Sequence, residues 1–224
     1  IEFVTAYGAT YNPSKNSLKL PQLIALKASA DATLADVITK NTNYNNKVNE
    51  RITAFSGLKS LSTRLVNALQ TTDATTETIG NAKTFNRKMQ GKKASSSQTP
   101  TDPNTPAPNT ISTSQQSYDQ LIQHLAGLTS ILEAETSYTP NETDLQVATL
   151  QTKIADLTAK NTAVATAYAS ISNSRIARNE TLYSSSTGLV ETANEVKKYI
   201  KSVFGASSPQ FAQVKGIQFK IIKN

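Results

Sequence analysis

The chain has 224 residues, a formal net charge of +7, no cysteine, no tryptophan and a single histidine. The absence of cysteine excludes disulfides and thiol chemistry, and one histidine leaves almost no room for a zinc site or an imidazole-based triad. The apolar fraction of 38% suits helices joined along a narrow seam better than a sphere of this size. No apolar run approaches the ~18 residues of a membrane-spanning helix. No signal peptide is visible, and the start at Ile1 leaves a removed leader as an open alternative.

Residues 1–20 are expected to form a strand followed by turns. Ile1, Phe3 and Tyr7 fall on one face of an alternating segment, and Gly8 and Pro13 indicate turns after it. Pro21 suits the first turn of a helix, because proline there loses no hydrogen bond.

Residues 21–90 are predicted to form one long helix. Apolar side chains recur at heptad spacing, which places a stripe on one side of the helix; its two rows are Ala30, Val37, Tyr44, Arg51, Leu58 and Leu65, and Leu34, Asn41, Val48, Phe55, Ser62 and Leu69. We expect Gly57 to soften this helix without ending it, and a kink near residues 71–74 is an alternative.

Residues 91–113 change character, with serine, threonine and four prolines, and are predicted to be a flexible linker. Residues 114–138 then indicate a shorter helix, which Pro140 separates from the next helix along the chain. Residues 141–205 carry a second heptad seam, with the rows Val147, Ile154, Asn161, Tyr168, Arg175, Leu182, Leu189, Val196 and Val203, and Leu150, Leu157, Val164, Ile171, Arg178 and Ser185. As one helix this stretch would be roughly 90 Å long.

Residues 206–224 are predicted to end the chain in a strand. Gly205 and Pro209 stop the preceding helix, and Ile217, Phe219 and Ile221 lie on one face of an alternating segment. The fold class is therefore mainly α: one rod-like domain, an elongated antiparallel bundle or coiled coil of two or three long helices, with a small β element from the two terminal segments.

Five polar residues fall on seam positions, where burial without a partner would be costly: Asn41, Arg51, Asn161, Arg175 and Arg178. A binding or gating layer is one interpretation. We favour layers that set the register of the helices, with arginine heads paired to Glu50, Glu180 or backbone carbonyls. The order Asn, Tyr, Arg after Lys40 and after Lys160 also suggests either an internal duplication or a convergent design of the two seams.

No catalytic, cofactor or metal constellation is recognised, and no motif of a known family is present. The residue three before His124 is Leu121, so the Glu-x-x-His pattern of a di-iron bundle is missing. The basic groups include Lys83, Arg87, Lys88, Lys92 and Lys93, for which solvated helix faces are a simpler explanation than a nucleic-acid groove.

The sequence therefore predicts a non-enzymatic structural protein, a self-assembling subunit of a filament, sheath or surface assembly. Assembly would use the helical seams and exchange of the terminal strands, with Ile1, Phe3, Tyr7, Ile217, Phe219 and Ile221 at the interface. Pairing of the two strands within one molecule is the alternative. A homo-oligomer or polymer at a bacterial cell surface or outside the cell is favoured over a cytoplasmic protein. The alternative is a basic adaptor that binds nucleic acid, an anionic membrane surface or polysaccharide.

Overall fold

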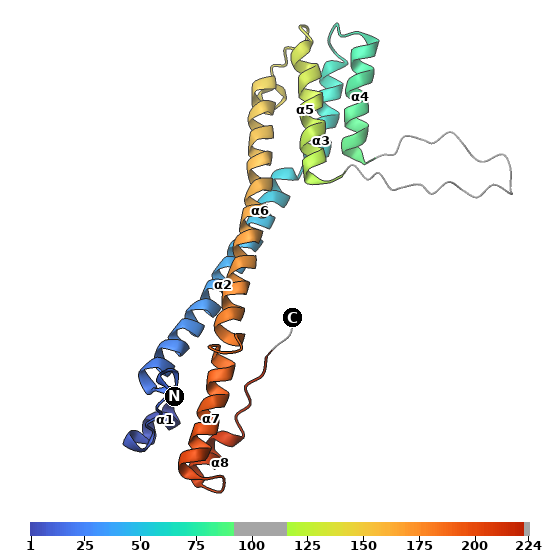
Figure 1. Ribbon diagram of the computed structural model, residues 1–224. Coiled ribbons are helices and arrows are strands. Elements are labelled where there is room, and N and C mark those ends of the chain that lie inside the picture. Colours follow the sequence, from blue (N-terminus) through green and yellow to red (C-terminus); the bar gives the residue numbers. More distant parts are fainter. Residues whose placement is uncertain (92–115, 222–224) are drawn as a thin grey trace, which may run out of the picture. The chain divides into compact units, whose positions relative to one another are not determined.

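A computed structural model describes residues 1–91 and 116–221, and over these residues the chain is mainly helical (Figure 1). The chain divides into two compact units: unit 1 comprises residues 1–45 and 166–224, and unit 2 comprises residues 46–165. Two long helices contribute to both, α2 (Leu20–Phe55) and α6 (Val147–Tyr183). No helix within the described residues is long and apolar enough to cross a membrane.

Unit 2 is built from the end of α2, the helices α3 (Leu58–Leu69), α4 (Thr76–Gln90) and α5 (Tyr118–Ala134), the short 3-10 helix η3 (Thr143–Leu145) and the start of α6. Gly57 adopts a left-handed conformation at φ 78° before α3. The side chains of Thr75 and Ser117 cap α4 and α5 by accepting a hydrogen bond from a backbone N–H. The core is closed, and its fully buried side chains include Leu65, Leu69, Met89, Leu125, Leu128, Leu132, Leu150 and Leu157.

Unit 1 contains α1 (Glu2–Ala6), the 3-10 helices η1 (Gly8–Thr10) and η2 (Asn16–Leu18), the start of α2, the end of α6, α7 (Leu189–Phe204) and α8 (Pro209–Lys215). Ser208 caps α8 through a hydrogen bond from the Phe211 N–H. The buried core is smaller than that of unit 2 and consists of Val4, Tyr11, Leu23, Ile200 and Val214.

The structure corrects four of the predicted elements. Residues 2–6 form a helix, and residues 216–221 form neither a helix nor a strand, so the predicted β element is wrong for the described residues. The predicted helix over 21–90 is three helices, since Gly57 ends the first segment and residues 70–75 separate α3 from α4. The predicted helix over 141–205 is interrupted between Tyr183 and Leu189. The predicted linker lies outside the described residues, apart from Gly91, which ends α4.

α2 and α6 run antiparallel in each unit, as the seams predict. In unit 1, the Ser174 hydroxyl donates to the Asp36 carboxylate at 2.6 Å, and the rings of Tyr44 and Tyr168 lie 5.9 Å apart. In unit 2, Arg51 donates to the Asn161 side chain at 2.9 Å. One predicted row of α6 turns away from α2 towards the end of the helix. Arg175 of that row is exposed, and Ser174 is buried in its place. The elongated shape remains a prediction.

The two units share a turn that the sequence repeats as Tyr-x-Pro followed by leucine five residues later. In unit 1 the Tyr11 hydroxyl donates to the Leu18 carbonyl at 2.8 Å, and in unit 2 the Tyr138 hydroxyl donates to the Leu145 carbonyl at 3.0 Å. Each turn contains a 3-10 helix and leads directly into a long helix. Superposing the two tyrosine turns aligns Asn41 with Tyr168 in the sequence. The Asn-Tyr-Arg order would align Asn41 with Asn161 instead, so the two alignments of the halves differ.

The tyrosine turns predict a loss of stability in alkali. Burial, together with the negative charges of Glu142 and Asp144, raises the pKa of Tyr138 to about 12; burial and the neighbouring Tyr199 raise the pKa of Tyr11 to about 12. A folded-state pKa above the unfolded value stabilises the fold fully below pH ~10, and this stabilisation is lost as the pH rises towards 12. In a titration followed by tyrosine absorbance, Tyr11 and Tyr138 should ionise late, and Tyr138→Phe should remove one of these two late ionisations.

Candidate functional site

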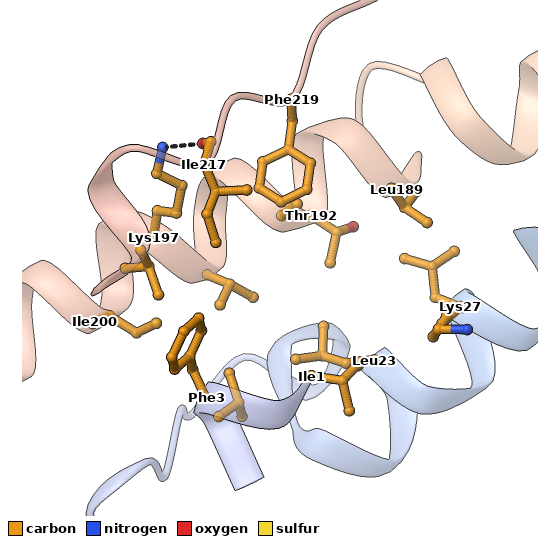
Figure 2. A pocket seen from close by; sticks show the side chains of 15 residues that line it. Ile1, Phe3, Leu23, Lys27, Leu189, Thr192, Lys197, Ile200, Ile217 and Phe219 are labelled. Carbon is orange, nitrogen blue, oxygen red and sulfur yellow. Dashed lines mark hydrogen bonds between the residues drawn. The ribbon is translucent and has the colours of Figure 1, made fainter. Parts of the chain in front are cut away.

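An apolar cavity of about 290 Å³ lies in unit 1, among α1, α2, α7, α8 and the segment that follows α8 (Figure 2). Fifteen side chains line it: Ile1, Phe3, Val4, Leu23, Leu26, Lys27, Leu189, Thr192, Ala193, Val196, Lys197, Ile200, Val214, Ile217 and Phe219. Apart from Thr192 and the two lysines, these side chains are apolar. The cavity can therefore hold apolar groups and offers few polar partners.

Both terminal segments contribute to the wall of the cavity. Ile1, Phe3 and Ile217 are each 40% exposed, although they are large apolar side chains. Lys197 fixes the C-terminal segment because its ammonium donates to the carbonyls of Lys215 at 3.1 Å and Ile217 at 2.7 Å. Exposed apolar side chains that gather around one cavity are typical of a contact surface.

The structure brings together four of the six residues predicted for the assembly interface. Ile1, Phe3, Ile217 and Phe219 line the cavity within one molecule. Tyr7 lies elsewhere in unit 1, with its ring 5.0 Å from Phe204 and its hydroxyl donating to the Gln210 carbonyl. Ile221 is 57% exposed and does not line the cavity. The alternating pattern placed these four residues together, but no strand forms at either end within the described residues, and their role in assembly stays a prediction.

The sequence did not associate the opposite wall with these residues. Leu23 and Leu26 come from the first turns of α2, and Leu189, Val196 and Ile200 come from α7. Leu189 and Val196 were assigned to the seam of one continuous helix. The interruption before Leu189 separates α7 from α6, and Gly188, which precedes Leu189, was the available signal for it.

Two of the predicted polar seam residues meet in unit 2. The Asn161 side chain accepts from Arg51 and donates to the Asp119 carboxylate at 2.7 Å. The Arg51 guanidinium also lies 4.0 Å from the centre of the Tyr118 ring. This network ties α5 to both long helices, and the role of such polar layers in setting the register stays a prediction. The predicted partner Glu50 is replaced by Asn161.

The remaining predicted residues do not gather into a site. Asn41 and Arg178 are half-buried in unit 1, where Arg178 donates to the neighbouring Asn179. Lys83 and Arg87 are exposed on α4, where Lys88 lies 5.6 Å from the Phe85 ring. Lys92 and Lys93 lie outside the described residues. His124 is buried in unit 2, its ring 6.4 Å from that of Phe85, and the described residues contain no group of three metal-ligating side chains.

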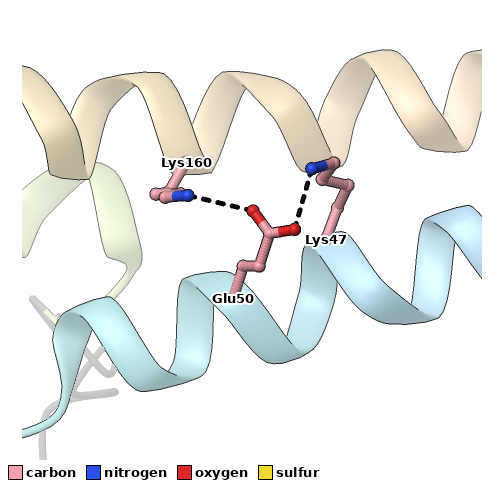
Figure 3. Close-up of polar contacts among 3 residues, drawn as sticks. All are labelled: Lys47, Glu50 and Lys160. Carbon is pink, nitrogen blue, oxygen red and sulfur yellow. Dashed lines mark hydrogen bonds and ion pairs between the residues drawn. The ribbon is translucent and has the colours of Figure 1, made fainter.

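A second polar contact joins the long helices in unit 2, where Glu50 bridges two lysines (Figure 3). Its carboxylate accepts from Lys47 at 2.8 Å and from Lys160 at 3.0 Å. These two hydrogen bonds hold the pKa of Glu50 below its ordinary value, and the bond from Lys47 has the larger effect. Glu50 in turn raises the pKa of Lys160.

The Glu50 bridge predicts a small acid-sensitive contribution to stability. Because the pKa is lowered in the folded state, the contribution is present above the unfolded value of ~4.3 and is lost as the pH falls through the folded pKa. Lys160→Met should therefore raise the pKa of Glu50 towards its ordinary value, as measured by carboxyl-carbon NMR. Lys153→Met is the matched control, since Lys153 donates to the Ala54 carbonyl and not to Glu50. An unchanged pKa in Lys160→Met would contradict the bridge.

Comparison with protein-family models, curated proteins and solved structures finds no match for this chain. The class of protein is therefore defined by the fold and the site alone. It is a mainly helical protein of two units, in which unit 2 has a closed core and unit 1 an open apolar cavity.

Proposed function

We propose that this is a non-enzymatic structural protein, a subunit that self-assembles or joins an assembly of protein chains through the cavity of unit 1. The observation that carries the proposal is the group of exposed apolar side chains, Ile1, Phe3 and Ile217, around a cavity whose lining is almost entirely apolar. A filament, sheath or surface assembly is the form of assembly that the sequence favours.

The physical support is the cost of leaving such a surface in water. Burial of apolar surface contributes roughly 25 cal/mol per Å², so covering these side chains with a partner would favour association. Polar cavities with titratable groups are typical of enzymes, and here the titratable groups at the cavity are Lys27 and Lys197. Lys27 is paired with Asp31, and Lys197 binds backbone carbonyls.

The proposal is tested by the mass of the protein in solution, measured by light scattering over a range of concentrations. We expect multiples of the 24.1 kDa chain for the unchanged protein and a monomer for Phe3→Asp, which places a charge at the cavity. Ile38→Asp is the matched control, because Ile38 is 68% exposed on α2 away from the cavity. A monomer at every concentration would contradict self-assembly.

The second candidate is an adaptor for an anionic partner. A shallow hollow on α7 and α8 is lined by four lysines and one carboxylate, together with Asn194 and Phe211; the charged residues are Lys197, Lys198, Lys201, Lys215 and Glu191. Ionic strength distinguishes the two candidates: apolar assembly should persist in high salt, whereas binding to a phosphate polymer should weaken steeply.

A further inference from the structure

We propose that the cavity of unit 1 is a docking groove for an amphipathic α-helix that carries the apolar pattern of the first part of α5. The docked helix would follow the course that the first part of α5 takes in unit 2. This inference rests on the proposed function and names the chemistry of the partner segment.

The tyrosine turns make the two units comparable residue by residue at the start of the long helices. Leu23 and Leu150 each lie five residues after the leucine whose carbonyl accepts from the tyrosine, and both are buried. Lys27 and Ile154 occupy equivalent positions one turn further along. The wall that α2 gives to the cavity in unit 1 is therefore the wall that α6 gives to the core of unit 2.

The opposite wall corresponds in the same way. Counted from the first residue of each helix, Leu189, Val196 and Ile200 of α7 stand where Leu58, Leu65 and Leu69 stand in α3. Ile200 and Leu69 are both buried, and each helix follows an interruption that contains a glycine. α8 and α4 also correspond, since a hydroxyl caps each of them by accepting from the N–H three residues on.

In unit 2, α5 fills the space between these walls. Its buried side chains Leu125, Leu128 and Leu132 belong to the same core as Leu58, Leu65 and Leu150, with Leu121 partly buried one turn earlier. In unit 1, α1 is the equivalent of the last turn of α5 only. Val4 lies two residues before the end of α1 and Leu132 two residues before the end of α5, and both are buried.

The positions of Leu121, Leu125 and Leu128 therefore have no counterpart among the described residues of unit 1. The cavity lies at this place, bounded by Leu23, Leu189 and Val196, and Ile1 and Phe3 are exposed at its edge. A close-packed interior leaves few voids, so an apolar cavity at the position of a missing helix is best filled by a helix. The partner must carry leucine-like side chains spaced four and three residues apart, as Leu121, Leu125 and Leu128 are in α5.

The test uses the full chain with Phe3→Trp, which introduces its only tryptophan at the edge of the cavity. The probe is a blocked peptide of residues 117–129, the part of α5 that α1 lacks. We expect the peptide to shift the tryptophan emission to shorter wavelength in a saturable way with one peptide per chain, because a docked helix excludes water from the indole. The reporter lies in unit 1, so exchange of the peptide with α5 in unit 2 would not produce the signal.

Two matched controls make the result specific. A peptide with Leu121→Asp and Leu125→Asp, and a protein with Leu189→Asp, should each weaken binding at least about tenfold, since each places a charge in an apolar contact. Leu189 is the first residue of α7, where an acidic side chain is compatible with the helix, and circular dichroism should show the fold unchanged.

Three results would overturn the inference. The first is no shift of the tryptophan emission with the peptide, and the second is an equal shift with the peptide that carries Leu121→Asp and Leu125→Asp. The third is a shift with dodecanoate and none with the peptide, which would indicate a small apolar ligand. A shift without peptide can also rise with protein concentration as the chain self-associates. If the peptide did not reverse that shift, the cavity would be covered by something other than an α5-like helix, and the inference would be overturned. Binding of the peptide by a protein that stays monomeric would support the groove and contradict self-assembly, so the two proposals can fail separately.

Discussion

Leu128→Ala should destabilise unit 2 by about 2–5 kcal/mol, the usual cost of a buried leucine that is truncated in a closed core. Leu128 lies in the middle of α5, is fully buried, and shares its core with Leu65 and Leu69 of α3. Neighbouring helices can relax only partly into the space that is left, so the lost contacts add to the loss of transfer free energy. Hydrogen exchange followed by mass spectrometry should show reduced protection of α3, α4 and α5.

Leu34→Ala provides a control with the same chemical change. Leu34 is 43% exposed on α2, so the substitution should change the free energy of unfolding by about 0.5 kcal/mol or less. An equal cost for both substitutions would contradict the closed core of unit 2. It would also remove the contrast with unit 1 on which the docking groove depends.

The helical class could be predicted because heptad spacing continues over many turns in both halves of the chain. Short segments are harder to assign, since seven residues fit a short strand and about two turns of a helix almost equally well. At the N-terminus, burial of Val4 against Tyr11 and Leu23 favours a helix, and Val4 lies on the face opposite the one that the alternation selects. Only the neighbouring elements could decide this.

The interruptions of the long helices show a second limit. Gly57 was expected to stay within a helix, but its left-handed conformation ends one segment and directs the chain into α3. A glycine in a helix costs about 1 kcal/mol and does not by itself indicate a break. The break is favoured because it brings Leu58, Leu65 and Leu69 into the core of unit 2.

The seam was predicted correctly along one row of α6, whereas the other row follows the prediction at Val147, Ile154 and Asn161 and departs from it further along the helix. Val164 and Ile171 are buried as predicted, whereas Tyr168 is 58% exposed and Ala167 takes its place. An undistorted helix has 3.6 residues per turn, so a strict step of seven drifts by about 20° per heptad. The exposed Arg175 follows from this drift and needs no partner in the seam.

Only the terminal residues of the candidate site could be predicted from the sequence. Alternation placed Ile1, Phe3, Ile217 and Phe219 on common apolar faces, and these residues meet at the cavity. The repeat that explains the cavity was not found, because the two turns share little beyond Tyr, Pro and Leu, and the long helices diverge after them. The hydrogen bonds of Tyr11 and Tyr138 make the correspondence evident.

Gly188→Ala should destabilise α7 and the wall of the cavity by about 3 kcal/mol or more, which is at the upper end of the cost of overpacking. A Cβ at Gly188 would lie 2.5 Å from the Ser184 nitrogen and 2.6 Å from the Ser184 oxygen. Both are backbone atoms at the end of α6, where the Gly188 N–H donates to the same Ser184 carbonyl at 3.0 Å. The backbone of Gly188 has an ordinary φ of −65°, so the cost arises from steric overlap and not from backbone conformation.

Two other glycines separate steric from conformational effects. Gly80 lies inside α4 with open space around it, so Gly80→Ala should stabilise the protein by about 0.5–1 kcal/mol. Gly57 also has open space but is left-handed, so Gly57→Ala should cost about 1–2 kcal/mol. Hydrogen exchange of α7 measures the loss of stability caused by Gly188→Ala. A loss no larger than the one caused by Gly57→Ala would show that the turn after α6 can move. In that case the wall formed by Leu189 and Val196 would not be fixed, and the Leu189→Asp control would lose its meaning.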